Sequence, residues 1–166
     1  MAVVAGGGAV TALPGHASPH FLWSELGVTT ATPAAHRDSM GVLASTILEP
    51  IRAHVGTAVR VNRPDIGLLN RGWRASQGIG SPTSQHLVGQ AADIDIDGDL
   101  VALFRWLAFD SGLPFGQAII EKRRTAHWSW IHVSLGAPYR DPGKCGQVLC
   151  SPDGTSYQRV TRATVL

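Results

Sequence analysis

The sequence predicts an α+β fold. Apolar residues recur at helical spacing from residue 33 to about residue 55, which indicates one long helix. Its inward-facing stripe consists of Met40, Leu43, Ile47 and Ile51. Short strand-like segments follow, with a single further helical pattern among them. Strands that do not alternate regularly with helices argue against a parallel βαβ sheet.

Both ends of the long helix carry recognisable signals. Thr32 is a capping candidate, and Pro33 suits the first helical position. Pro50 is predicted to kink or divide the helix, because proline has no backbone N–H to donate. Gly56 is predicted to end it.

The later elements are predicted from alternation and helical periodicity. Residues 63–80 are rich in turn residues and contain one possible short helix around Leu68. The predicted strands are 57–61, 92–96, 117–121 and 128–135, the second helix is 99–109, and a small hairpin is expected around Val148 and Tyr157.

Composition limits the class of protein. The chain has 166 residues, which suits a single domain, and a formal net charge of +2, which is too small to indicate a nucleic-acid partner. No apolar run approaches the roughly 18 residues of a membrane span. Residues 1–17 are rich in glycine and alanine and are predicted to form a flexible arm without a clear secretory signal. Cys145 and Cys150 either close a small disulfide loop or remain free thiols.

Polar residues gather on one face of two predicted strands. Alternation places Asp93, Asp95 and Asp97 together, opposite two isoleucines. In the later strand, Trp130 and His132 share a face. If the two strands are neighbours, their apolar faces form the core, and Asp93 and His132 converge on the other side.

A turn before the first of these strands can bring a third polar group. His86 lies in a segment that Gly89 allows to bend sharply. Two imidazoles and one carboxylate form a ligand set that catalytic zinc uses, with one position left for water. The alternative is chance, because a histidine and an aspartate seven residues apart occur often without a metal.

A wider pattern resembles a known family. Ser84-x-His86-x-x-Gly89-x-Ala91-x-Asp93, followed by the strand around His132, is similar to the zinc D-alanyl-D-alanine metallopeptidases, which share their fold with the hedgehog signalling domain. That family includes phage endolysins and virion-associated domains. The similarity covers roughly residues 18–140, so residues 141–166 are expected to form a C-terminal extension.

The resemblance implies a fold, a cofactor and a substrate. It implies a small antiparallel sheet flanked by helices, with zinc bound by His86, Asp93 and His132. It also implies cleavage of peptide bonds in bacterial peptidoglycan stems or cross-links.

The chain departs from the family at the expected general base. Many relatives have an acidic residue three positions before the last histidine ligand, where this chain has Ser129. The resemblance to closer phage-type relatives makes Glu121 the candidate base, although it also suits a surface position beside Lys122. His127 resembles a histidine of relatives that lack the acidic residue, so it is either a group that stabilises the transition state or an ordinary loop histidine.

The chain also departs from the family at the residue that binds the substrate. Relatives carry an arginine that binds the substrate carboxylate, and this chain has Asp65 at the matching place. Arg63 is a candidate substitute, as are Arg71 and Arg74; the alternative is that carboxylate recognition is lost.

Two further residues have either a substrate-binding or a purely structural role. Ser84 is a candidate substrate contact or a turn serine that binds its own backbone. Trp130 either lines a substrate groove or covers the edge of the sheet.

Two functions follow as hypotheses. The first is a zinc peptidase that acts on the bacterial cell wall, encoded by a phage and located in the virion or in the host cytoplasm before lysis. The second is a virion structural or wall-docking module with weak or no catalysis, which binds other virion proteins.

Overall fold

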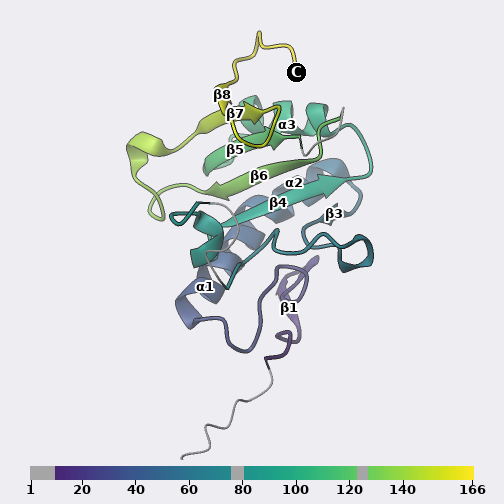
Figure 1. The fold of residues 1–166 in the computed structure, drawn as a ribbon, viewed down its shortest axis with the longest axis vertical. Helices are drawn as coiled ribbons and strands as arrows, with labels where there is room; N and C mark the ends of the chain where they lie inside the picture. Colours follow the sequence, from purple (N-terminus) through teal and green to yellow (C-terminus); the bar gives the residue numbers. More distant parts are fainter. Residues whose placement is uncertain (1–9, 76–80, 123–126) are drawn as a thin grey trace, which may run out of the picture.

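The computed structural model describes residues 10–75, 81–122 and 127–166. It contains a two-stranded antiparallel sheet, a six-stranded mixed sheet and a small number of helices, shown in Figure 1. The prediction of combined α and β structure is confirmed.

The long helix is continuous from Ala34 to Val55 but changes geometry within its length. It consists of α1 (Ala34–Leu43), a π-helical segment η1 (Ala44–Leu48) and α2 (Glu49–Val55). The π segment ends two residues before Pro50, so regular α geometry is interrupted next to the proline while the helix continues. Gly56 ends the helix in the left-handed conformation, as predicted. Thr32 does not cap it; its hydroxyl accepts a hydrogen bond from the Thr29 N–H instead.

The main sheet has the strand order β3-β4-β6-β5-β7-β8. Its strands are β3 (Val59–Arg60), β4 (Ala91–Ile96), β5 (Phe115–Glu121), β6 (Trp130–Leu135), β7 (Gln147–Ser151) and β8 (Gln158–Arg159). The predicted hairpin near the C-terminus is present as β7 and β8.

The main sheet is not purely antiparallel, because β7 runs parallel to β5. After β6, the chain passes through the short 3₁₀ helix η4 (Pro142–Lys144) and reaches the far edge of β5 rather than pairing with β6. The resemblance implied a small antiparallel sheet; the two-stranded sheet is antiparallel, whereas the main sheet is larger and mixed.

The core lies between the main sheet and the helices. The long helix and α3 (Leu100–Phe109) lie behind the sheet in Figure 1, which leaves the opposite face toward the viewer. Asp99 caps α3 by accepting a hydrogen bond from the Ala102 N–H. The largest fully buried side chains include Met40, Ile47, Ile94, Phe104 and Ile131.

The N-terminal segment is attached to this body from residue 10 onward. β1 (His16–Ser18) pairs with β2 (Phe21–Leu22), and the Leu13 N–H donates to the Val28 carbonyl. Part of the predicted flexible arm therefore makes backbone hydrogen bonds, and its residues 1–9 lie outside the described residues. The region that contained the possible helix around Leu68 instead forms a 3₁₀ helix, η2 (Pro64–Ile66).

Candidate metal centre

Two members of the predicted cluster are placed by backbone pairing. β4 and β6 are antiparallel neighbours, and Asp93 pairs directly with His132. The apolar partners Ile94 and Ile131 pair one position further and face the core. The alternation in the sequence therefore places a carboxylate and an imidazole side by side on the face away from the helices, as predicted.

His86 reaches them from a short 3₁₀ helix, η3 (Gln85–Val88). Ser84 begins this helix, and its hydroxyl accepts a hydrogen bond from the His86 N–H at 3.4 Å. Gly89 ends it with φ of 71°, and a Cβ at this position would lie 2.1 Å from the His36 carbonyl oxygen of α1. Only glycine allows this combination of turn and close approach.

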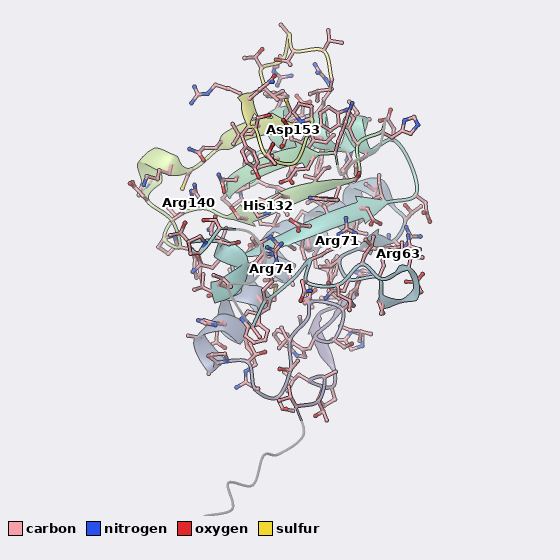
Figure 2. All side chains as sticks on the ribbon, in the orientation of Figure 1. Arg63, Arg71, Arg74, His132, Arg140 and Asp153 are labelled. Atoms are coloured by element: carbon pink, nitrogen blue, oxygen red, sulfur yellow. The ribbon has the colours of Figure 1, made fainter. Side chains whose placement is uncertain are left out.

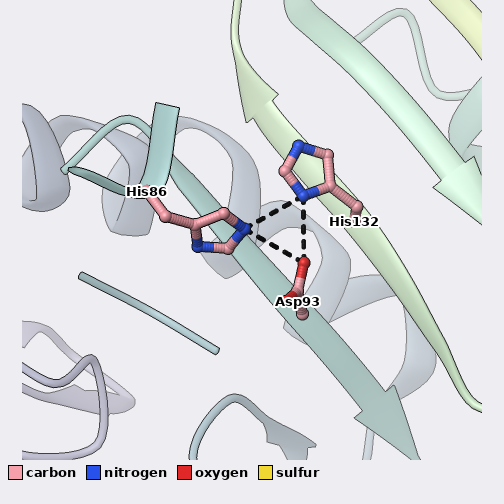
Figure 3. Close-up of side chains that lie close together, drawn as sticks. All are labelled: His86, Asp93 and His132. Carbon is pink, nitrogen blue, oxygen red and sulfur yellow. Dashed lines mark hydrogen bonds and ion pairs between the residues drawn. The ribbon is translucent and has the colours of Figure 1, made fainter. Parts of the chain in front are cut away.

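Three ligand atoms converge between these elements, as Figure 3 shows. His86 Nε2 lies 3.2 Å from Asp93 Oδ1 and 3.1 Å from His132 Nδ1, which is itself 2.9 Å from the same carboxylate oxygen. Atoms bound to one tetrahedral zinc ion at about 2.0–2.1 Å are roughly 3.3 Å apart. The spacing fits a single cation, and the cluster could hold a metal ion.

The surroundings orient two of the three side chains, His86 and Asp93. The Nδ1–H of the buried His86 donates to the Gly72 carbonyl at 2.8 Å, which directs Nε2 at the cluster. Arg74 Nη2 donates to Asp93 Oδ2 at 3.1 Å, so the other carboxylate oxygen faces the two imidazoles. Burial opposes ionisation of Asp93, but the charges and hydrogen bonds of His86 and His132 together outweigh it and hold the pKa of Asp93 well below its usual range.

The cluster lies in a pocket of about 600 Å³ that Glu121 also lines. Glu121 belongs to β5 and pairs with Trp130 of β6, two positions from His132. Burial, together with the negative charge of Asp93, raises the pKa of Glu121 to about 7. A carboxylate with this pKa can accept and release a proton near neutral pH.

The remaining predicted site residues fall into two groups. Ser84 and Trp130 line the pocket, whereas Arg63 and His127 do not. Arg63 forms an ion pair with Asp65, and it lies away from His132 in Figure 2. His127 lines a different cavity, next to Trp128.

Of the three arginines that were candidates for binding the substrate carboxylate, Arg63, Arg71 and Arg74, only Arg74 lines the pocket. Arg74 lines the pocket, and Arg71 is buried beside it in an ion pair with Asp95, with its guanidinium 5.5 Å from the Trp130 ring centroid.

Several pocket residues were not predicted from the sequence. Arg140 and Gln117 line the pocket together with Gln85, and Tyr157 comes from the C-terminal segment. Gln117 shared a predicted strand with Glu121 at alternating positions, so its face was available in the sequence. Arg140 and Tyr157 gave no such signal, because they lie in irregular segments. Cys145 and Cys150 are both free thiols.

Comparison with protein-family models, curated proteins and solved structures finds no match to this chain. Among the described residues, no helix combines the length and apolar character needed to cross a membrane.

Proposed function

We propose that this protein is a zinc-dependent peptidase that cleaves peptide bonds in bacterial peptidoglycan stems or cross-links. The observation that carries the proposal is the meeting of His86, Asp93 and His132 within about 3 Å of one another in a pocket shared with Glu121. The resemblance of the Ser84–Asp93 motif to the zinc D-alanyl-D-alanine metallopeptidases supports the choice of metal and substrate, and a hedgehog-like peptidase fold. It also supports a phage-encoded endolysin or virion-associated enzyme.

The residues present suit hydrolysis of an amide. Zinc held by the three ligands would polarise the carbonyl of the scissile bond and lower the pKa of a water molecule. Glu121 takes the proton from the attacking water on a carboxylate oxygen and then delivers it to the leaving amine nitrogen. Arg74 keeps Asp93 oriented throughout, since it binds the oxygen that faces away from the cluster.

Two substitutions separate metal binding from proton transfer. His86→Ala is expected to remove zinc and abolish release of amino groups from purified cell walls, whereas wild type binds about one zinc per chain. Glu121→Gln is expected to retain zinc and lose at least about 100-fold in rate. Metal content by mass spectrometry and wall hydrolysis measure the two effects, and His16→Ala, at an exposed histidine of β1, is the matched control.

The outcome also decides between the two functional classes. Full wall hydrolysis by His86→Ala would contradict the proposed mechanism. Bound zinc without turnover on several peptidoglycan types would favour the alternative, a virion structural or wall-docking module.

A further inference from the structure

Arg140 lines the pocket, and each hydrogen bond of its side chain goes to an uncharged oxygen. Its Nε–H donates to the Lys144 carbonyl at 2.9 Å, and Nη1 donates to the side-chain oxygens of Gln85 at 2.7 Å and Gln117 at 3.3 Å. Nη2 donates to the Gln147 oxygen at 3.2 Å. Within the described ranges no acidic side chain forms an ion pair with Arg140. No carboxylate of the described residues therefore balances the positive charge of this guanidinium.

The glutamines are themselves fixed in orientation. The amide nitrogen of Gln85 donates to the Leu135 carbonyl at 3.3 Å, and that of Gln117 donates to Gln147 at 2.9 Å. Their oxygens are thus left to face Arg140. Gln117 and Gln147 are also direct partners in the pairing of β5 with β7. The guanidinium is held in place before any ligand arrives, which lowers the entropic cost of binding.

The other arginine of the pocket has a different electrostatic role. Arg74 forms an ion pair with Asp93, so its charge is balanced by a member of the metal cluster. Arg140 has no such balance, and the second N–H of its Nη2 can donate to an oxygen of a carboxylate. Figure 2 shows that the two arginines lie on different sides of His132.

Strand register places Arg140 relative to the metal cluster. Gln117, Ile119 and Glu121 line the pocket from alternate positions of β5, and Ile119 pairs with His132. Alternate positions on a strand are about 7 Å apart. Glu121 and the Gln117–Arg140 contact therefore lie on opposite sides of the cluster, each about 7 Å along the strand.

We propose that Arg140, held by Gln85, Gln117 and Gln147, is a specificity-determining residue that binds a free carboxylate of the substrate peptide. The proposal rests on the proposed peptidase function. Because an extended peptide advances about 3.3 Å per residue, the carboxylate belongs within about two residues of the cleaved bond, on the side away from Glu121.

The test compares two ligands that differ only in charge: N-acetyl-D-alanyl-D-alanine and its C-terminal amide. Calorimetry in buffer that contains zinc should show about tenfold tighter binding of the acid by wild type, whether or not the protein holds the ion, since a charge-assisted hydrogen bond distinguishes the two. Arg140→Met should bind acid and amide equally, and Arg140→Lys should keep part of the preference. Arg159→Met removes an equal charge from the exposed strand β8 and should behave as wild type.

Each result supports or overturns the inference. Equal binding of acid and amide by wild type, failure to bind the acid, or an unchanged preference in Arg140→Met would each overturn it. Circular dichroism confirms that the variants are folded. Because the readout is binding, an inactive protein still gives an answer, and failure of the peptidase proposal shows separately as missing zinc or missing wall hydrolysis.

Discussion

Asp93 and Glu121 are two carboxyl groups of one pocket, and their partners give them opposite acidities. Asp93 is surrounded by His86, His132 and Arg74, all of which favour its ionised form. Glu121 is half-buried with the negative charge of Asp93 nearby, so ionisation is unfavourable and its pKa rises to about 7. One group is thereby suited to bind a cation and the other to exchange a proton.

The raised pKa of Glu121 predicts how the stability of the metal-free protein depends on pH. Between its ordinary value of 4.5 and about 7, the folded protein retains a proton that the unfolded chain releases. The stabilisation is therefore present at low pH and is lost as the pH rises through about 7. Glu121→Gln should remove this loss, so that the free energy of unfolding of the variant relative to wild type rises by on the order of 2 kcal/mol between pH 5 and pH 8.

Denaturant titrations at several pH values measure this difference. Asp38→Asn, at an exposed carboxylate on α1, is the control and should show no comparable trend. A difference between Glu121→Gln and wild type that stays constant over this pH range would contradict the assigned pKa.

At the residue scale, the grouping of His86, Asp93 and His132 could be predicted because these residues lie in regular sequence patterns. Asp93 and His132 alternate with buried isoleucines on neighbouring strands, and Gly89 marks the turn that holds His86. Arg140 could not be predicted, since its position depends on glutamines from three separate segments. Spacing in the chain gives no information about such contacts.

At the scale of elements, η3 depends on the contact between Gly89 and α1. Gly89→Ala would place a methyl group 2.1 Å from the His36 carbonyl oxygen and would also force alanine into a left-handed conformation. We expect a loss of about 3 kcal/mol or more in the free energy of unfolding, together with weaker zinc binding, because η3 carries His86.

Gly56→Ala is the matched control for this substitution. Gly56 has a similar φ of 68°, but nothing lies within 4 Å of an added Cβ. Its expected cost is about 1 kcal/mol, with zinc binding unchanged. Denaturation and competition with a chromophoric chelator measure both quantities, and equal effects of the two substitutions would show that the contact with α1 is unimportant.

The long helix shows what periodicity predicts and what it misses. Its extent and its buried face follow from the spacing of Met40, Leu43, Ile47 and Ile51. The π segment before Pro50 does not, because it arises when the backbone accommodates the missing N–H within a helix that packing holds together. Thr32 has the chemistry of a cap, but a bond to Thr29 uses its hydroxyl.

At the scale of the whole molecule, the C-terminal segment is part of the main sheet. β7 covers the edge of β5 along residues 117–121, and Cys150 and Val160 contribute to the core. Tyr157 and Leu149 line the pocket. The order of strands in the chain does not specify this arrangement, since β7 bypasses β6 to reach β5.

A chain that ends at Arg140 should therefore fail to fold cooperatively. It would expose the paired edge of β5 and lose part of the apolar core, and exposed strand edges promote association. Thermal unfolding followed by circular dichroism and size-exclusion chromatography measure the effect against the full chain. A soluble, cooperative product that still binds zinc would show that residues 141–166 are an appendage.

The pairing of Asp93 with His132 is part of the backbone hydrogen bonding of the main sheet. Two of the three candidate ligands are positioned by backbone hydrogen bonds between β4 and β6 over an apolar core, and the third lies on η3, which packs against α1. Such a scaffold exists before any cation enters, unlike small domains that collapse only around their metal. A bound ion would here contribute to the chemistry of the site, and the fold would be the same without it.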